Sequence, residues 1–215
     1  YTMFTDTVRA QQRRGHDVLI VVPPGGVNYK RLSGDGYPVE PLPVRSSKFD
    51  YLSAWKLSSL LKKRGADVLH THLTSSALLG SAAARWAGVP CVASVLKMTN
   101  KRRYMRCDML LPCSKAVYAD LASQGVPESM MRLVYTGIDI GRFMEGFDGR
   151  RAAREEFGYG DENIVMGIVA RLAPMKGHSF LLDAMPRVFE AHPGARLLVV
   201  GDGELRPELE EQGYG

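Results

Sequence analysis

The sequence predicts an α/β fold with parallel sheets, divided into two units, and three observations lead to this prediction. A segment of helical character that ends at a glycine and leads into a short apolar run recurs along the chain. The apolar runs, such as 18–22, have the length of strands, and none approaches the roughly 20 residues of a transmembrane helix. Residues 1–140 carry 19 Lys and Arg against 10 Asp and Glu, whereas residues 141–215 carry 9 against 13. Alternating helices and strands form right-handed βαβ units and hence a parallel sheet, and the opposite charge balances favour two units with different partners.

Residues 1–140 are expected to form the first unit, with its first strand missing because the chain begins with Tyr inside a predicted helix. The helices that apolar spacing and composition predict lie at 5–14, 52–64, 77–87 and 115–124. The strands that apolar runs predict lie at 18–22, 68–70, 90–95, 109–111 and 133–135. Gly15, Gly65 and Gly88 each follow a predicted helix, where glycine commonly ends helices because it tolerates the left-handed conformation.

Residues 141–160 are expected to be a linker with a connecting helix at 150–157. Residues 161–215 then supply two strands with an amphipathic helix between them, at 164–170, 178–191 and 196–200. Pro186 inside that helix is expected to kink it or to mark its true first turn. Two parallel strands leave most of a sheet uncovered, so we expect residues 161–215 to be the first half of a second domain.

Composition excludes several classes of protein. Hydrophobic residues make up 45% of the chain and charged residues 24%, which excludes bulk disorder, collagen and coiled coil. Cys91, Cys107 and Cys113 lie in or beside apolar stretches and form no C-x-x-C pair. We therefore expect buried thiols in a reducing compartment rather than a disulfide framework. The chain also lacks the apolar core of a secretory signal, which favours a cytoplasmic location.

The strongest local pattern is the segment 170–178, which leaves a predicted buried strand and enters a predicted helix. It places two cations, Arg171 and Lys176, five positions apart at the edge where open α/β sheets bind ligands. Free N–H groups and the positive dipole of a helix N-terminus favour a phosphate there. Arg171 can hold a phosphate with two parallel hydrogen bonds, and Lys176 can act as a point charge. The alternative is that both are solvated surface cations.

A second turn, Gly201-Asp202-Gly203, follows the next predicted strand. A dinucleotide-binding fingerprint would have Gly or Ala at position 206, where this chain has Arg206. The pattern therefore favours a glycine turn at which backbone approaches a ligand, with nicotinamide chemistry as the weaker alternative.

Two histidines two positions apart, His70 and His72, would lie on one face of a strand. No third ligand has sensible spacing, so we expect no metal site; one imidazole should be packed and the other should line a cleft. Cys113-Ser114-Lys115 lacks the G-x-S-x-G frame of a nucleophilic serine, so Ser114 is expected to cap a helix.

A basic cluster with one tyrosine inside it lies before the predicted strand at 109–111. It consists of Lys97, Lys101, Arg102, Arg103, Tyr104 and Arg106. Nucleic acid, an anionic membrane surface or an acidic acceptor, and a merely solvated loop are the alternatives. Since no recognised nucleic-acid module surrounds the cluster, we expect no nucleic-acid partner. We expect Lys101, Arg102, Arg103 and Arg106 to contact the membrane or another anion.

Six segments occur in the order seen in GT-B glycosyltransferases of family 4, and the chain resembles that family over nearly its whole length. These segments are Arg13 to Val18, Asp67 to His72, Cys113 to Lys115, Tyr135 to Asp139 with Phe143, Ala170 to Leu172 with Lys176 and Gly177, and Val200 to Gly203. The resemblance implies two Rossmann-like domains facing a cleft. It also implies that the first binds an acceptor and the second a nucleotide-diphosphate sugar, which is the co-substrate. Transfer with retention of anomeric configuration is implied, without an essential metal or other cofactor.

On this resemblance Arg171 and Lys176 match the family's basic pair that holds the donor diphosphate, so we expect them to bind the donor and to act in catalysis. The other residues expected on the donor side are Gly137, Gly201 and Gly203, and those expected on the acceptor side are His72, Leu96 and Lys97. The family often has His where this chain has Leu96 and Lys97, and its Asn-Gly-Ile-Asp has Thr136 in place of Asn.

The resemblance implies a hexosyltransferase-type enzyme that glycosylates a carbohydrate or lipid-linked acceptor in the synthesis of cell-envelope polysaccharide, lipopolysaccharide or glycolipid. A glycine-rich loop of the family would lie before Tyr1 and a pair of glutamates after Gly215, so this fragment alone is expected to be inactive. We expect a cytoplasmic protein, with a peripheral position on the anionic inner leaflet also open. The alternatives are a nucleotide-sugar-binding relative with lost catalysis, a nicotinamide-dependent oxidoreductase and a nucleic-acid-binding protein.

Overall fold

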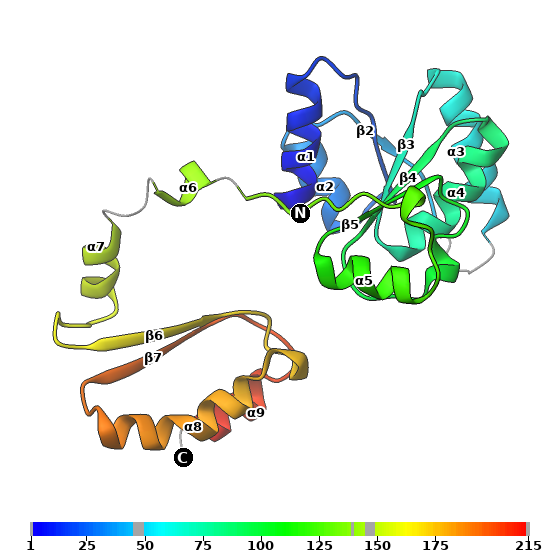
Figure 1. The fold of residues 1–215 in the computed structure, drawn as a ribbon. Helices are drawn as coiled ribbons and strands as arrows, with labels where there is room; N and C mark the ends of the chain where they lie inside the picture. Colours follow the sequence, from blue (N-terminus) through cyan, green and yellow to red (C-terminus); the bar gives the residue numbers. More distant parts are fainter. Residues whose placement is uncertain (1, 45–49, 139, 145–148, 214–215) are drawn as a thin grey trace. The chain divides into compact units, whose positions relative to one another are not determined.

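The computed structural model describes residues 2–44, 50–138, 140–144 and 149–213 (Figure 1). The chain divides into two compact units, Tyr1–Ile138 and Asp139–Gly215. Each unit is an arrangement of helices against parallel strands, as the alternating pattern predicts.

The first unit contains two sets of parallel strands. Its elements in order are α1 (Thr2–Arg13), β1 (Ile20–Val22), α2 (Val27–Gly34), β2 (Val39–Pro41), α3 (Tyr51–Arg64), β3 (Leu69–His72), α4 (Thr74–Ala87), β4 (Cys91–Val95), η1 (Lys101–Arg103), β5 (Met109–Pro112), α5 (Lys115–Ser123) and η2 (Glu128–Met130). Strand β1 pairs with β2, and β4 lies between β3 and β5. All these pairs are parallel, so the carboxyl ends of β3, β4 and β5 share one edge.

Helix α4 packs closely on the sheet because small residues line its buried face. A Cβ added to Gly80 would lie 2.6 Å from Cγ2 of Thr71 on β3. Ala77 and Ala84 are buried in the same core as Leu110 of β5 and Leu121 of α5. One core cluster of the unit therefore lies between β3–β5 and the helices that cover them, and another joins α1, β1 and α2 through Val8, Ile20 and Leu32.

The helix ends of this unit follow from local chemistry. Gly65 and Gly88 adopt φ values of 58° and 76° after α3 and α4, the left-handed conformation predicted for them. The Ser114 hydroxyl accepts a hydrogen bond of 3.2 Å from the N–H of Val117, which confirms that Ser114 caps α5. Cys91 and Cys107 are buried thiols, as predicted, and Cys113 is half-buried.

Three features of the first unit differ from the prediction. Helix α2 was not predicted, since with Leu32 as its one fully buried residue it has no apolar stripe in its sequence. Strand β2 was not predicted, since its three residues are too few to form an apolar run. The predicted strand at 133–135 is wrong. The N–H groups of Arg132 and Val134 do donate to carbonyls of β5. In this segment, however, only Met131 forms a β-bridge with that strand. An apolar triplet beside a strand is therefore not enough to form one.

In the described part of the second unit, helices α8 and α9 lie on the same side of the parallel strands β6 and β7 (Figure 1). Its elements are α6 (Ile140–Met144), α7 (Gly149–Glu156), β6 (Ile164–Val169), η3 (Pro174–Lys176), α8 (His178–Ala191), β7 (Ala195–Val200) and α9 (Arg206–Gly213). Strands β6 and β7 pair from Ile164↔Ala195 to Val169↔Val200. Helix α8 has the predicted bounds and runs through Pro186, so that proline does not mark a first turn. Helix α9 was not predicted, since Leu209 is its one buried residue.

Candidate functional site

The carboxyl ends of β6 and β7 continue side by side into the segment that carries the predicted cations. Beyond the strands, the N–H of Leu172 donates to the carbonyl of Asp202 at 3.0 Å. The N–H of Leu205 then donates to the carbonyl of Leu172 at 3.1 Å. These bonds fix the backbone around residue 171, and the buried side chains of Leu172 and Ala173 anchor it.

Arg171 and Lys176 are both exposed at this edge, on either side of that anchor. Neither side chain has a hydrogen bond or ion pair with another residue that the structure describes. Lys176 is the last residue of η3, and Gly177 then caps α8 without a side-chain hydrogen bond. The segment between β6 and α8 therefore carries two free cations and leads into the first N–H groups of α8, an arrangement that suits a diphosphate.

His178, the first residue of α8, is a feature that the sequence analysis did not identify. Its side chain is 3% exposed, and neither ring nitrogen has a hydrogen-bond partner among the described residues. No sequence pattern predicts that His178 is buried, because its burial depends on how η3 and α8 pack.

Gly201 and Gly203 are required by the chain's own backbone. A Cβ on Gly201 would collide with the carbonyl oxygen of Ala170, and one on Gly203 would lie 2.8 Å from the carbonyl carbon of Leu172. The two glycines therefore allow a close approach of backbone, as predicted, but the approach that the structure shows is to the segment that leaves β6. Contact between these glycines and a nucleotide is a proposal.

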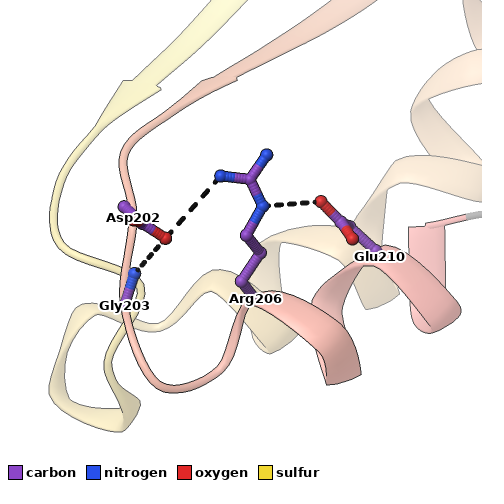
Figure 2. A network of polar contacts seen from close by, with 4 residues as sticks. All are labelled: Asp202, Gly203, Arg206 and Glu210. Atoms are coloured by element: carbon purple, nitrogen blue, oxygen red, sulfur yellow. Dashed lines mark hydrogen bonds and ion pairs between the residues drawn. The ribbon is translucent and has the colours of Figure 1, made fainter.

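A polar network pins the turn between β7 and α9 (Figure 2). Arg206 donates from Nε to Glu210 at 2.8 Å and lies 3.6 Å from the carboxylate of Asp202. That carboxylate also accepts from the N–H of Gly203 at 2.9 Å. The hydrogen bond with Glu210, helped by Asp202, raises the pKa of Arg206. The spacing of four positions between Asp202, Arg206 and Glu210 is the sequence signal that could have predicted this network. Arg206 also occupies the position at which a nicotinamide-binding fingerprint needs a small residue.

The predicted acceptor-side residues gather at the carboxyl edge of β3 and β4 in the first unit. His72 ends β3, and Leu96 and Lys97 directly follow β4. Leu96 is half-buried and Lys97 is exposed. The structure therefore brings these three positions to one edge of the sheet, as strands in parallel require.

The two histidines of β3 contact each other, as expected for two side chains on one face of the strand. Both are half-buried, their ring centroids are 4.3 Å apart, and Phe4 of α1 contacts His72 edge-on at 5.0 Å. His70 shares a hydrogen bond of 2.9 Å with Ser94. Among the described residues, no cluster of three His, Cys, Asp or Glu could hold a metal ion.

The environment of these imidazoles favours their neutral form. Burial lowers the pKa of His70, and burial together with repulsion from His70 lowers the pKa of His72 to about 4. The Nδ1 atom of His72 has no hydrogen-bond partner in the described part of the chain, so a proton there would be poorly compensated.

We expect the first unit to lose stability as the pH falls from 7 to 5. An unfolded His72 binds a proton near pH 6.5, whereas the folded one does so only near pH 4, so the unfolded state binds more protons in between. The loss due to His72 should be about 2 kcal/mol at pH 5. Urea unfolding of the His72→Gln variant should show a correspondingly weaker pH dependence, whereas His16→Gln, at an exposed site, should behave like the parent. An equal pH dependence in His72→Gln and the parent would contradict this account.

Gly137, predicted on the donor side, lies in the exposed segment that ends the first unit. Nothing lies within 4 Å of a Cβ added there, so packing within this unit does not require the glycine. Asp139 of the same motif and the side chain of Phe143 lie outside the described part of the chain.

The basic cluster is smaller than predicted because Lys101 serves the fold. Its ammonium group donates to the carbonyl of Gln124 at the end of α5, and its N–H donates to the Gln124 side chain at 2.9 Å. Tyr104 is 1% exposed and hydrogen-bonds Thr74 at 3.1 Å, so it is unavailable for stacking on a base. Arg102, Arg103 and Arg106 are exposed, as is Lys97.

No helix in the described ranges is both long and apolar enough to cross a membrane.

Both units match models of glycosyltransferase families. Residues 2–142 match Glycosyltransferase Family 4, and residues 149–214 match Glycosyl transferases group 1. One relative is the Escherichia coli UDP-Gal:alpha-D-GlcNAc-diphosphoundecaprenol alpha-1,3-galactosyltransferase, 27% identical over 74% of this chain and 46% of its own length. A D-inositol 3-phosphate glycosyltransferase from Segniliparus rotundus is 43% identical over 35% of this chain and 17% of its own length.

Solved structures show the same fold. A glycosyltransferase from Rickettsia africae matches with a TM-score of 0.82 and 18% identity, over 99% of this chain and 59% of its own. Anabaena Alr3699/HepE, crystallised with UDP, matches with a TM-score of 0.75 and 19% identity, over 90% of this chain and 57% of its own. The chain thus spans about half the length of the E. coli relative and of these structures. With one family model matching most of its length and a second covering the rest, this chain belongs to the GT-B glycosyltransferases of family 4.

Proposed function

We propose that the full-length protein is a retaining glycosyltransferase. It moves a sugar from a nucleotide-diphosphate donor to a carbohydrate or lipid-linked acceptor in the synthesis of cell-envelope polysaccharide or glycolipid. The printed name of the E. coli relative, with its UDP-galactose donor and diphosphoundecaprenol acceptor, supports the two substrate classes. UDP in the Anabaena structure supports a uridine nucleotide as one candidate donor. The observation that carries the proposal is the pair of cations, Arg171 and Lys176, which are unpaired among the described residues and lie on the segment between β6 and α8.

The proposed chemistry explains why this edge needs two cations. The bond between the anomeric carbon and the diphosphate oxygen breaks, and a hydroxyl oxygen of the acceptor forms the new bond and loses its proton. Negative charge grows on the leaving diphosphate as the bond breaks. Preorganised positive groups stabilise this charge more in the transition state than in the bound substrate, which lowers the barrier. Arg171 and Lys176 would supply this charge, so we propose that no metal ion or other cofactor is essential.

We propose that the acceptor binds at the carboxyl edge of the sheet in the first unit, where His72, Leu96 and Lys97 lie. A neutral imidazole at His72 can accept or donate a hydrogen bond to an acceptor hydroxyl. Leu96 can only supply apolar contact, so it cannot exchange a proton with the acceptor. Lys97 is exposed and can bind an acidic acceptor.

An assay on the full-length protein tests this function. UDP- and GDP-sugars are supplied with lipid-linked and free-sugar acceptors, and nucleotide release and glycosylated product are followed. We expect nucleotide release that needs acceptor, a product with the donor's anomeric configuration by NMR, and activity that survives EDTA. Inverted configuration would contradict the retaining mechanism, and loss with EDTA would contradict metal independence.

The half-buried Leu96 favours one alternative, a relative that binds the donor without transferring the sugar. Binding of UDP- or GDP-sugar with no product for any acceptor would support this alternative. Binding of NADH in preference to both would instead favour an oxidoreductase, against which the placement of Arg206 argues.

We further propose a cytoplasmic protein whose exposed arginines contact the anionic inner leaflet. Each cation near such a surface contributes about 1 kcal/mol, so the double variant Arg102→Gln/Arg103→Gln should bind vesicles containing phosphatidylserine roughly 30-fold more weakly. Lys62→Gln/Lys63→Gln, at the exposed end of α3, changes the net charge equally and should bind like the parent. Sedimentation with vesicles measures this. Equal losses in both variants would show only an effect of net charge.

A further inference from the structure

The two buried cysteines of the first unit form a pair at the amino end of the sheet. Their Sγ atoms are 3.8 Å apart, and the residues are 1% and 2% exposed. Cys91 begins β4, and Cys107 lies two residues before the start of β5, the strand that pairs with β4. The pair lies at the opposite edge of the sheet from His72, so it belongs to neither of the proposed substrate sites. Cys113 follows β5 at its other end.

A hollow of about 430 Å³ in the surface is lined by residues that flank this pair in the sequence. Its lining includes Ser81, Arg85, Pro90, Arg106 and Asp108. Pro90 directly precedes Cys91, while Arg106 and Asp108 flank Cys107 on either side. The hollow has the size of a pocket for a small molecule, and its lining contains the chain neighbours of both cysteines.

The charges around the hollow favour an anion. The guanidinium groups of Arg85 and Arg106 are exposed there. The one carboxylate, that of Asp108, accepts a hydrogen bond of 2.7 Å from the N–H of Cys91. With two cations and one anion, the lining of the hollow has a net positive charge.

The contact between the thiols makes them chemically different. The hydrogen bond between them lowers the pKa of Cys107 and raises the pKa of Cys91. Since the thiolate is the nucleophile in exchange with a disulfide, Cys107 is suited to react first and Cys91 to resolve the product.

We propose that Cys91 and Cys107 form a reversible disulfide by exchange with a small anionic disulfide of the glutathione disulfide class, which enters through this hollow. The Cys107 thiolate attacks one sulfur of the small disulfide, whose S–S bond breaks, and one small thiol leaves with the proton that Cys107 gave up. The Cys91 thiol then loses its proton and attacks Sγ of Cys107, releasing the second small thiol. The two protein thiols are oxidised, and the small disulfide is reduced to two thiols.

Geometry allows the bond because the two sulfurs already touch. They must approach from 3.8 Å to about 2.0 Å, and we expect rotation of the two side chains to bring them together. The bond would close the loop between β4 and β5 that carries Arg102 and Arg103. We therefore expect the oxidised protein to unfold at a higher temperature than the reduced one.

The folded chain, incubated with glutathione disulfide and then alkylated, tests the proposal by peptide mass spectrometry. The expected result is a Cys91–Cys107 link that dithiothreitol removes, with Cys113 alone alkylated. Cys91→Ser should stop at a glutathione adduct on Cys107, and Cys113→Ser should form the link like the parent. Alkylation of all three cysteines in the folded chain, when the denatured chain does oxidise, would overturn the proposal, as would a link to Cys113.

A second experiment, which leaves both thiols in place, tests the route. Arg106→Gln should slow the reaction with glutathione disulfide several-fold relative to the uncharged 2-hydroxyethyl disulfide. Arg102→Gln, an exposed arginine that does not line the hollow, should leave the ratio of the two rates unchanged. An unchanged ratio in Arg106→Gln would contradict entry through the hollow.

Discussion

Replacing Arg171 with Gln in the full-length protein is expected to lower the kcat of the proposed sugar transfer about 10²- to 10³-fold, and Lys176→Gln should have a similar effect. In the proposed mechanism each cation stabilises charge that grows on the leaving diphosphate, and loss of one such group typically raises a barrier by about 2.7–4 kcal/mol. Both side chains are exposed and unpaired within the described residues, so neither change should alter folding. Steady-state kinetics with the donor varied would measure the effect.

A matched control for these variants is Arg187→Gln. Arg187 is an exposed arginine of the same helix, α8, and lies away from its N-terminus. It should leave kcat unchanged. If Arg171→Gln and Arg187→Gln had equal effects, the cations at the start of α8 would have no special part in transfer.

Gly203→Ala is expected to destabilise the second unit by about 3 kcal/mol or more. The added Cβ would lie within 3 Å of the backbone N and carbonyl carbon of Leu172, and a clash with backbone cannot be relieved by turning a side chain. Urea unfolding would measure the loss. Activity of the full-length enzyme should fall along with the folded fraction, because the same segment of backbone holds Arg171.

Gly167→Ala on β6 is the control for this prediction. A Cβ there would meet the Leu198 carbonyl oxygen at 3.9 Å, an ordinary contact, so its stability should change little. A Gly203→Ala variant as stable as Gly167→Ala would contradict the packing described between the two strand exits.

The alternation of helices and strands could be predicted because it depends on local chemistry. The bounds of α8 and the cap at Ser114 follow from apolar spacing and a hydroxyl in the right place. Helix α2 lacks such a pattern, because its stability comes from one buried leucine, and the triplet at 133–135 has the composition of a strand without the pairing. Pairing depends on residues distant in the sequence, which no local pattern contains.

The candidate site, too, could be predicted from the sequence in part. The positions of Arg171 and Lys176 follow from the order of strand, loop and helix, so the sequence places them correctly on that loop. The contact between His72 and Phe4 and the bond between Lys101 and Gln124 join segments far apart in the chain. The sequence therefore predicted a free lysine where the structure has a hydrogen bond, and it gave no signal for the contact between Phe4 and His72.

Titration calorimetry of the full-length protein with UDP- and GDP-sugars tests most directly whether Arg171 and Lys176 together bind the donor diphosphate. The account predicts measurable binding of at least one donor by the parent protein and at least a tenfold weaker affinity for the variant in which both residues are Gln, with an unchanged unfolding midpoint. Equal affinities for the parent and a correctly folded double variant would contradict it.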